Sequence, residues 1–269
     1  MSKEHKSHLI KIICGILGFF FLLFIWWLVS YLLHQNDNRL LPYPHEVFQK
    51  LGEILFSPSY AQTTWEAMGW SLLRLVIGFV ISFLFGGVFG TLGGLYPKFA
   101  SFMGPYISFS KTMPTAAFVL ILVGIFYSYR GLAPYIPCFL VFMVAFPVIY
   151  EAFKSGIQNE SKDTQDALDL DCGRRSWSAI REVLLPDAQN YIALALVQSL
   201  GLSMKVSVMS EILTNSSDSR GGLGGLIQNA SLWGGMQEVL AYSLLAVLII
   251  LAIDLPLFLL KKQLKVGLD

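Results

Sequence analysis

Side chains able to contact a solute recur within one apolar stretch, residues 188–213. They fall at intervals of four on one slowly drifting helical face and comprise Ala195, Ser199, Ser203, Ser207 and Glu211, with Lys205 nearby. Ionisable residues at membrane depth are costly, so by default they face a cavity or a partner. Two interpretations stay open for Lys205, which either faces a solute path or pairs locally. For Glu211 we favour a position at the outer membrane interface over one on such a path.

No catalytic signature accompanies these side chains in the sequence. The glycine runs at 86–94 and 221–225 lack the Lys-Ser/Thr pair that completes a phosphate-binding loop. A G-x-S-x-G elbow, an H-E-x-x-H pair and paired intramembrane carboxylates are also missing. The histidines have no ligand spacing, and Cys14, Cys138 and Cys172 are too scattered for a disulfide framework. We therefore expect no enzymatic activity, metal or cofactor in this chain, and any transport needs an external energy source or an ion gradient.

Composition and apolar stretches predict an all-α polytopic membrane protein. Hydrophobic residues make up 55% of the 269 residues and charged residues 14%, whereas about a quarter of an ordinary soluble domain is charged. Formal net charge is +1, which gives no reason to expect nucleic acid as a partner. About 20 apolar residues cross a bilayer, and six stretches qualify: 9–33, 67–95, 102–127, 134–153, 188–213 and 239–260.

The chain divides into an N-terminal part and a core. Residues 1–60 contain a tail, an anchor helix without a cleavage pattern, and an outer connection whose second half is expected to lie along the membrane surface. Residues 61–269 contain the other five spans. Pro114 interrupts the third, and such a break is tolerated only where protein or a water-filled cavity satisfies the freed backbone. We expect residues 127–132 to turn outside and residues 214–236 to form a glycine-rich outer connection.

A ridge of small residues runs along the second span. Its members recur every four residues and are Gly78, Ser82, Gly86, Gly90 and Gly94. In lipid, small residues let helix backbones approach closely. We therefore favour packing against another helix of the same protein, with a direct role in a permeation path as the alternative.

The distribution of positive charge orients the spans. With both termini inside, twelve Lys/Arg are cytoplasmic: Lys3, Lys6, Lys11, Lys98, Lys154, Lys162, Arg174, Arg175, Arg181, Lys261, Lys262 and Lys265. Four lie outside (Arg39, Lys50, Arg130, Arg220) and three within or at the edge of spans (Arg74, Lys111, Lys205). This bias follows the positive-inside rule, so we expect cytoplasmic termini.

The longest polar segment, residues 166–186, then lies in the cytoplasm. Apolar positions are threaded through its charges, and from Cys172 onward their spacing is roughly helical. This pattern predicts a short amphipathic helix, and a loop between spans needs such a helix only where something docks on it.

The segment resembles the EAA loop of bacterial ABC importer permeases. Gly173 and the pair Leu185-Pro186 match that signature in identity and separation, and Val183 takes the hydrophobic place before the pair. The position of the family's glutamate falls on Ala167, with Asp166 one residue earlier. Either Asp166 takes that role after a local shift, or the contact is lost.

Shorter stretches resemble the nitrate/sulfonate/taurine-type permeases of that family, in the same order along residues 40–260. They are LLPYPHEV, SLLRLVIGF, the proline-interrupted KTMPTAAFVLIL, and GLGGLI at residues 222–227. Only the EAA loop is diagnostic by itself, and the other stretches support the subfamily.

The resemblance implies a type I ABC importer permease fold in a bacterial inner membrane. Such a subunit forms the path for a small solute, pairs with a second permease, here expected to be an identical copy, and receives the solute from an external binding protein. ATP is bound by a separate cytoplasmic ATPase that grips the coupling loop, about residues 156–187. The implied docking residues are Asp166, Ala167, Leu168, Gly173, Trp177, Ile180, Leu185 and Pro186.

Physical roles suit several of these residues. Gly173 permits a tight turn, Pro186 stops the helix from continuing into the next span, and Leu168, Trp177 and Ile180 supply an apolar docking face.

Three other classes fit the sequence less well. A gradient-driven transporter would need coupling residues and internal repeats, a membrane enzyme lacks its site, and a structural or signalling subunit would not explain the EAA spacing. The resemblance leaves the solute open between a small anion (nitrate-, sulfonate- or taurine-like) and a vitamin precursor (thiamine-pyrimidine- or riboflavin-like).

Overall fold

The structure, a computed structural model, describes residues 3–35, 40–126, 133–214 and 219–265, and every regular element in them is a helix. Five helices in these residues are long and apolar enough to cross a membrane: α1 (Lys3–Gln35), α3 (Ala61–Leu95), α6 (Ile136–Gln158), α10 (Gln189–Thr214) and α12 (Met236–Lys265). The helices α4 (Pro97–Thr112) and α5 (Thr115–Phe126) meet at a bend of 99° and make a sixth span if taken together. The prediction of an all-α chain with about six spans is confirmed. The turn expected at 127–132 lies outside the described residues.

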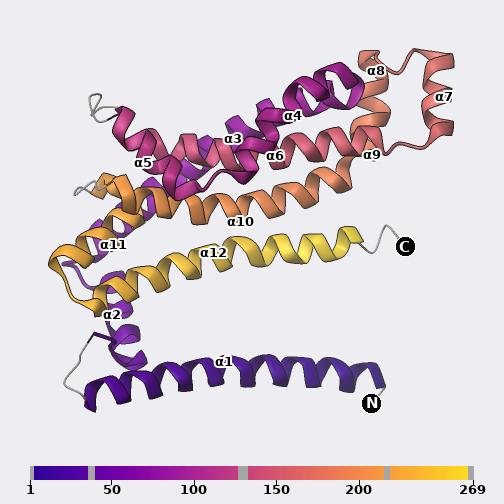
Figure 1. Cartoon of the computed structure of the whole chain (residues 1–269). Coiled ribbons are helices and arrows are strands. Elements are labelled where there is room, and N and C mark those ends of the chain that lie inside the picture. The colour runs from indigo at the N-terminus through magenta and orange to yellow at the C-terminus, as the bar shows by residue number, and fades with distance from the viewer. Residues whose placement is uncertain (1–2, 36–39, 127–132, 215–218, 266–269) are drawn as a thin grey trace.

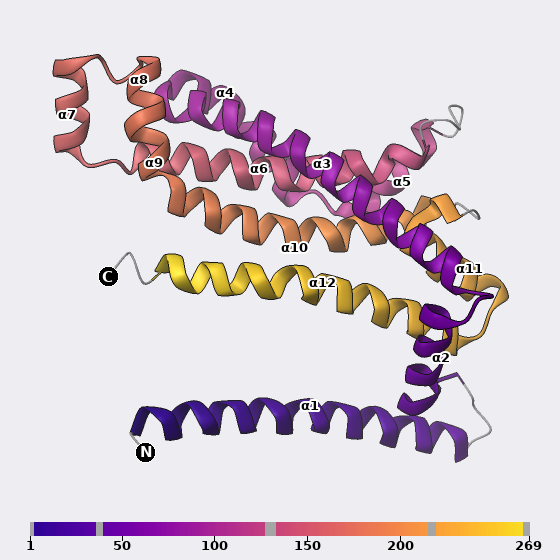
Figure 2. The same cartoon turned by 180° about the vertical axis from the view of Figure 1, so that it is seen from behind.

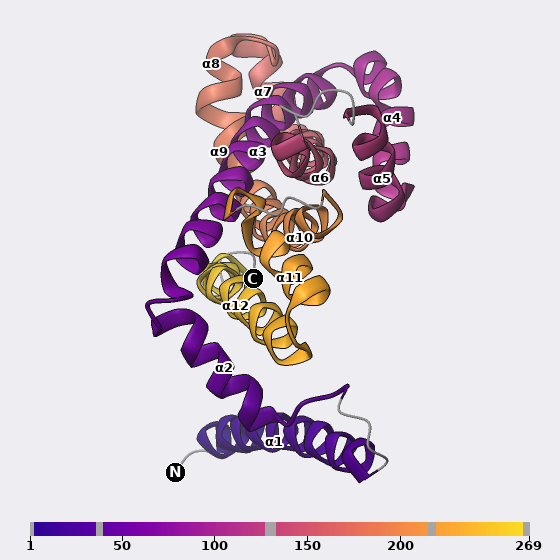
Figure 3. The same cartoon turned by 90° about the vertical axis from the view of Figure 1, so that its left-hand side faces the viewer.

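The long helices run side by side, in the order α12, α10, α6 and α3, with α4 and α5 beyond α6 (Figures 1 and 3). The short helices α7 (Lys162–Asp171), α8 (Trp177–Ala179) and α9 (Leu185–Asp187) project from one end of this bundle, and α11 (Gly222–Trp233) lies at the other (Figures 1 and 2). We call these the α8 end and the α11 end. Helix α1 lies apart from the bundle and reaches it through α2 (Pro44–Phe56), with Ser30 Oγ donating a hydrogen bond to the Pro42 carbonyl at 2.9 Å.

The small-residue ridge of α3 lies against α6. A Cβ added at Gly78 would lie 2.6 Å from the Cys138 carbonyl oxygen, and one added at Gly90 would lie 2.6 Å from the Tyr150 carbonyl oxygen. Ser82, also fully buried, donates its hydroxyl hydrogen bond back to the Gly78 carbonyl at 2.7 Å. The missing side chains therefore allow two helix backbones to approach to a distance that no larger residue permits.

We expect Gly90→Ala to destabilise the protein, because the new methyl group meets backbone atoms of α6 rather than a flexible side chain. Overpacking of this kind costs about 1–3 kcal/mol. The matched control is Gly69→Ala in the same helix, where nothing lies within 4 Å of the added Cβ. The apparent melting temperature of purified protein in detergent should fall for Gly90→Ala only, and an equal fall for both variants would contradict close packing at Gly90.

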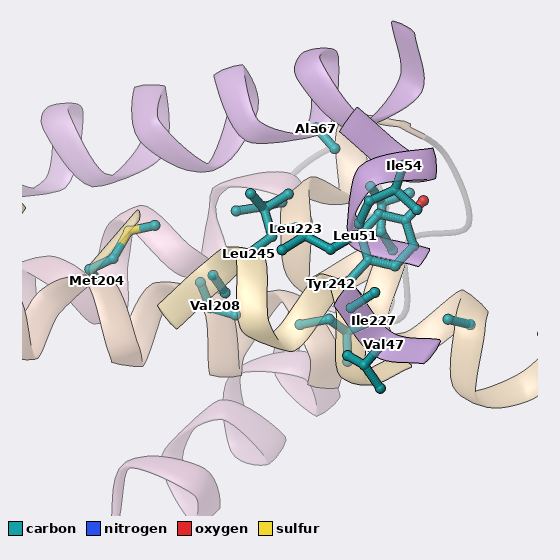
Figure 4. Close-up of a cluster of buried hydrophobic side chains, with 14 of the residues drawn as sticks. Val47, Leu51, Ile54, Ala67, Met204, Val208, Leu223, Ile227, Tyr242 and Leu245 are labelled. Atoms are coloured by element: carbon teal, nitrogen blue, oxygen red, sulfur yellow. The ribbon is translucent and has the colours of Figure 1, made fainter. Parts of the chain in front are cut away.

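The largest apolar core lies toward the α11 end, where six helices contribute buried residues (Figure 4). These residues come from α2 (Val47, Leu51, Ile54), α3 (Ala67, Leu75), α6 (Val141), α10 (Met204, Val208), α11 (Leu223, Leu226, Ile227, Ala230) and α12 (Ala241, Tyr242, Leu245, Ala246). Within the connection expected at 214–236, residues 222–233 are helical and contribute to this core. This stretch folds as α11, because its apolar residues at helical spacing are buried between α3, α10 and α12.

Helix α2 is held on the bundle by one apolar face and by one lysine. Lys50 Nζ lies 3.2 Å from Glu53 and 3.0 Å from Glu238 of α12. Burial lowers the pKa of Lys50, but its hydrogen bonds to Glu238 and Glu53 act more strongly, so the pKa lies above its ordinary value. The lysine therefore stays charged and ties α2 to the start of α12.

Candidate functional site

The polar segment predicted to dock a partner forms a helical hairpin at the α8 end (Figures 1 and 2). It consists of α7 (Lys162–Asp171), α8 (Trp177–Ala179), a π-helical turn (Ile180–Leu184) and α9 (Leu185–Asp187). The helix expected to begin at Cys172 begins instead at Trp177. Ser176 caps it, since its Oγ accepts a hydrogen bond from the Ala179 N–H at 3.2 Å.

Gly173 forms the turn between α7 and α8. Its φ of +80° lies in the left-handed region, and its N–H donates to the Leu168 carbonyl at 2.7 Å, which closes the end of α7. The next N–H, that of Arg174, donates to Asp169 Oδ1 at 3.2 Å. The prediction that this glycine permits a tight turn agrees with its backbone conformation.

Two arginines fasten the hairpin to the spans. Arg174 donates to Gln165 Oε1 at 2.8 Å and to the carbonyl of Ile157 in α6 at 3.2 Å. The Arg175 guanidinium stacks over the ring of Tyr96, between α3 and α4, at 4.8 Å from its centroid. The orientation of the hairpin is thus fixed relative to two neighbouring spans.

The predicted apolar docking face divides into two sides. Leu168 is 8% exposed and packs with Leu95, Ile157, Ala179 and Leu184, with Ile180 half-buried against the same cluster. Both residues therefore hold the hairpin together, and the burial of Leu168 corrects its assignment to the docking face. Trp177 remains on the outside, 72% exposed. Asp166 and Ala167 are exposed on α7.

Leu170 is the most exposed large apolar residue of the hairpin, at 89%, and the sequence reasoning missed it. A signal was available, because Leu170 lies two residues after Leu168 on the same helix. Two residues rotate a helical side chain by about 200°, so an inward Leu168 requires an outward Leu170.

The stop assigned to Pro186 falls two residues later, at Ala188, where the chain turns into α10. Proline removes an N–H and clashes with the preceding turn. The backbone widens before it, since the Leu185 N–H donates to the carbonyl of Ile180, five residues back. The π-helical turn lets the short helix continue through Pro186, which is exposed, while Leu185 is half-buried against α6 and α10.

A second polar constellation lies buried near the α11 end. Arg74 of α3 and Glu211 of α10 form an ion pair at 3.0 Å, with side chains only 6% and 1% exposed. Glu211 also accepts from Ser71 Oγ at 2.7 Å and from the Gly224 N–H at 3.1 Å, and Arg74 donates to the main-chain oxygen of Arg220. The favoured position of Glu211 at the membrane interface is corrected, because its carboxylate points into the protein.

The glycines of α11 make room for this carboxylate. Gly222 has a φ of +74°, and a Cβ there would lie 2.5 Å from Glu211 Cδ. A Cβ at Gly224 would lie 2.5 Å from Glu211 Cβ and 2.7 Å from the Ile212 nitrogen. The stretches SLLRLVIGF and GLGGLI thus meet at one network that joins α3, α10 and α11.

The candidate path residues of α10 lie on different faces of the helix. Ser199, Ser203 and Ser207 are fully buried, and Ser199 donates its hydroxyl to the carbonyl of Ala195 within the same helix. Like Glu211, they are covered by neighbouring helices and have no accessible surface for a solute. Lys205 is exposed on another face.

A family model described as "Binding-protein-dependent transport system inner membrane component" matches residues 82–265, more than half of the sequence. The chain belongs to this family. It is an ABC transporter permease with several spans in the inner membrane, which confirms the family resemblance. The permease is 25% identical over 245 residues to the taurine transport system permease protein TauC of Escherichia coli (strain K12), covering 90% of this chain and 85% of TauC.

Two further comparisons agree with this family. The permease is 27% identical over 231 residues to the nitrate import permease protein NrtB of Leptolyngbya laminosa, covering 83% of this chain and 77% of NrtB. Its structure is similar to the MetNI methionine ABC transporter in an inward-facing conformation, with a TM-score of 0.56 and 16% identity. That match covers 76% of this chain and 94% of the solved chain, and it confirms the permease fold.

Another ion pair lies at the bend of the broken span. Lys111, at the end of α4, pairs with Glu151 of α6, and their side chains are 42% and 44% exposed. The interruption predicted at Pro114 is present, and it places a half-exposed ion pair within the membrane-spanning part of the permease. The sequence places Lys111 within or at the edge of a span but gives no indication of its partner Glu151.

Proposed function

We propose that this permease is the solute-conducting subunit of an ATP-driven importer, and that the α7–α9 hairpin docks on a separate ATPase that binds the ATP. The single observation that supports this role is the hairpin itself. Two arginines and an apolar cluster fix it to the spans, yet it presents Leu170 and Trp177 to solvent. A rigid support beneath exposed apolar side chains is what a docking surface needs.

The proposal includes an orientation and further partners. With the positive-inside charge bias, the α8 end is cytoplasmic, as are both termini, and the α11 end faces outside. A solute-binding protein delivers the solute at the α11 end. A second copy of the permease completes the path, because one chain leaves polar side chains exposed on the surface of its spans.

The exposed part of the path is proposed to include Lys205 together with the Lys111–Glu151 pair. Charged side chains that remain partly exposed on spans are expected to face water or a partner rather than lipid. A small anion, taurine- or nitrate-like, is the solute we favour, because two relatives are named for those solutes and Lys205 is a cation. A vitamin precursor is the alternative, and the positive charge of Lys205 gives no reason to favour it.

The docking role predicts that Trp177→Ser combined with Leu170→Ser releases the ATPase. Each residue has the exposure and apolar bulk of an interface anchor, and loss of one such anchor costs 2 kcal/mol or more, about thirtyfold in affinity. We expect the affinity for the ATPase to fall about thirtyfold or more, so that little ATPase co-purifies with the permease. Vanadate-sensitive uptake should fall with it.

Phe56→Ser supplies the matched control, because Phe56 is equally exposed but lies at the end of α2, far from the α8 end (Figure 1). Membrane insertion, followed by the yield of monodisperse permease, should be unchanged in all variants. Full ATPase recovery with the double serine variant would remove the hairpin from the docking role.

A further inference from the structure

Two oppositely charged residues within the spans have no partner among the described residues. Lys205 of α10 is exposed and Asp254 of α12 is half-buried, and neither forms a hydrogen bond or an ion pair there. Unpaired ionisable groups at membrane depth are costly and by default serve a function. The sequence reasoning considered Lys205 and overlooked Asp254.

Asp254 and Lys205 flank the same junction between α10 and α12. The Asp254 carboxylate lies over Gly201, with Oδ2 3.0 Å from where a Cβ of that residue would be. Lys205 follows Gly201 by one turn and is rotated from it by about 40°. Helical side chains lean toward the N-terminus of their helix, so the lysine leans toward the level at which the carboxylate lies.

The junction is far from both ends of the span. Gly201 is 12 residues from Gln189 and 13 from Thr214, or about 18 and 20 Å along the helix axis. Lys205 is nine residues from Thr214, about 14 Å along the helix axis, and Asp254 lies opposite Gly201, so neither charge lies at an end of its span. Water or a polar molecule must therefore come to them.

The exposed face of α10 gives access to these groups. Tyr191, Gln198, Leu202, Lys205 and Met209 are exposed along it. On one side of this face Val206 packs with Val119 of α5, and on the other Gly201 meets α12. The buried serines lie on a different face of α10. The exposed stripe thus runs between α5 and α12, with Asp254 along its α12 border.

The structural ion pair Arg74–Glu211 differs from Lys205 and Asp254 in its contacts and burial. Arg74 and Glu211 are in direct contact, almost fully buried, and every oxygen of that carboxylate has a hydrogen-bond donor. Lys205, which is exposed, and Asp254, which is half-buried, flank one junction and form no ion pair with each other. This arrangement is expected of groups kept available for a ligand, since a purely structural pair gains nothing from staying unsatisfied.

We propose that Lys205 and Asp254 form a two-charge subsite for a short zwitterionic solute, with an anionic group at one end and an amine at the other. The Lys205 ammonium donates hydrogen bonds to the anionic group, and the Asp254 carboxylate accepts them from the protonated amine. The subsite rests on the proposed function, because it places the solute on the path through the permease. It narrows the solute class from small anions in general to those that also carry an amine.

Three probes of equal chain length test this subsite: 2-aminoethanesulfonate, ethanesulfonate and ethylamine. Their saturable retention is measured by equilibrium dialysis on the purified full-length permease with any ATPase that co-purifies. Asp254→Asn and Lys205→Gln should each lower retention of the zwitterion about tenfold or more, the effect of losing one charge-assisted hydrogen bond. Ethanesulfonate should respond to Lys205→Gln only, and ethylamine to Asp254→Asn only.

Glu66→Gln and Lys98→Gln are the matched controls, because both residues are exposed near the ends of their helices. The subsite is ruled out if the unaltered permease does not retain the zwitterion saturably, or if Asp254→Asn binds it as well as the unaltered protein. It is also ruled out if both single variants lower the retention of all three probes equally, since that result indicates a structural pair.

ATP-driven uptake by the unaltered permease separates the two proposals. If ATP-driven uptake occurs but the three probes do not respond to Lys205→Gln and Asp254→Asn as stated above, the subsite alone is overturned. The probe pattern without any ATP-driven uptake supports the subsite and overturns the importer role.

Discussion

Glu211→Ala is expected to lower the yield of folded permease more than any other single change to a span. The substitution leaves the Arg74 guanidinium charged and almost fully buried without its partner, and breaking a buried pair in this way costs about 3–5 kcal/mol. Ser71 Oγ and the Gly224 N–H lose their acceptor at the same time. Because these donors belong to α3 and α11 and Glu211 belongs to α10, the loss should loosen α11 from α3 and α10. The measurement is the monodisperse fraction of permease extracted in detergent.

A second variant separates loss of the pair from loss of the fold. Arg74→Met combined with Glu211→Leu removes both charges, and replacement of a buried pair by apolar residues is often close to neutral. We therefore expect the double variant to recover much of the yield lost in Glu211→Ala. Glu66→Ala is the control, because Glu66 is an exposed carboxylate on α3. If the double variant were no better folded than Glu211→Ala, the unpaired arginine would not be the cause.

This network shows where reasoning from the sequence stops. In the sequence Glu211 lies near the end of an apolar stretch, and that pattern by itself favours a position at the membrane interface. Its donor Ser71 is 140 residues away in the chain, so no local pattern joins the two. Arg74 approaches Glu211 only because α3, α10 and α11 pack together. The same packing requires glycine at 222 and 224, where a Cβ would clash with Glu211.

Periodicity was informative where one property repeats along one helix. The spacing from Gly78 to Gly94 places these residues on one face of α3, where they lie against α6. The same kind of spacing in α10 was ambiguous, because a row of serines can line a water-filled path or let two helices approach. The structure buries Ser199, Ser203 and Ser207 and leaves Lys205 exposed. The choice depends on what stands opposite the row, which is a tertiary property.

The hairpin was predicted in position but not in detail. Its charges and the separation of Gly173 from Pro186 placed it between two spans, as observed. Which apolar residues face outward depends on how α7 and α8 fold against each other across the turn. That contact turns Leu168 inward and leaves Leu170 and Trp177 exposed. The stretch that resembles the family signature therefore includes residues that build the hairpin itself.

Gly173→Asp is expected to lower the rate of ATP-dependent uptake at least tenfold, while membrane insertion stays intact. Space is not the reason, since nothing lies within 4 Å of an added Cβ, but the φ of +80° strains most side chains. The new carboxylate would also lie next to the end of α7, which already carries Asp169 and Asp171. Left unpaired at the proposed docking surface, such a charge costs several kcal/mol of interface energy.

Two further variants at the same position separate charge from backbone strain. Asn has nearly the shape of Asp and tolerates the left-handed conformation, so Gly173→Asn should retain most of the uptake. Val is uncharged but β-branched, and at this φ it should distort the turn and lower uptake as Asp does. Uptake is measured in proteoliposomes at equal permease content. Normal uptake by both Gly173→Asp and Gly173→Val would show that the turn at Gly173 has no part in coupling.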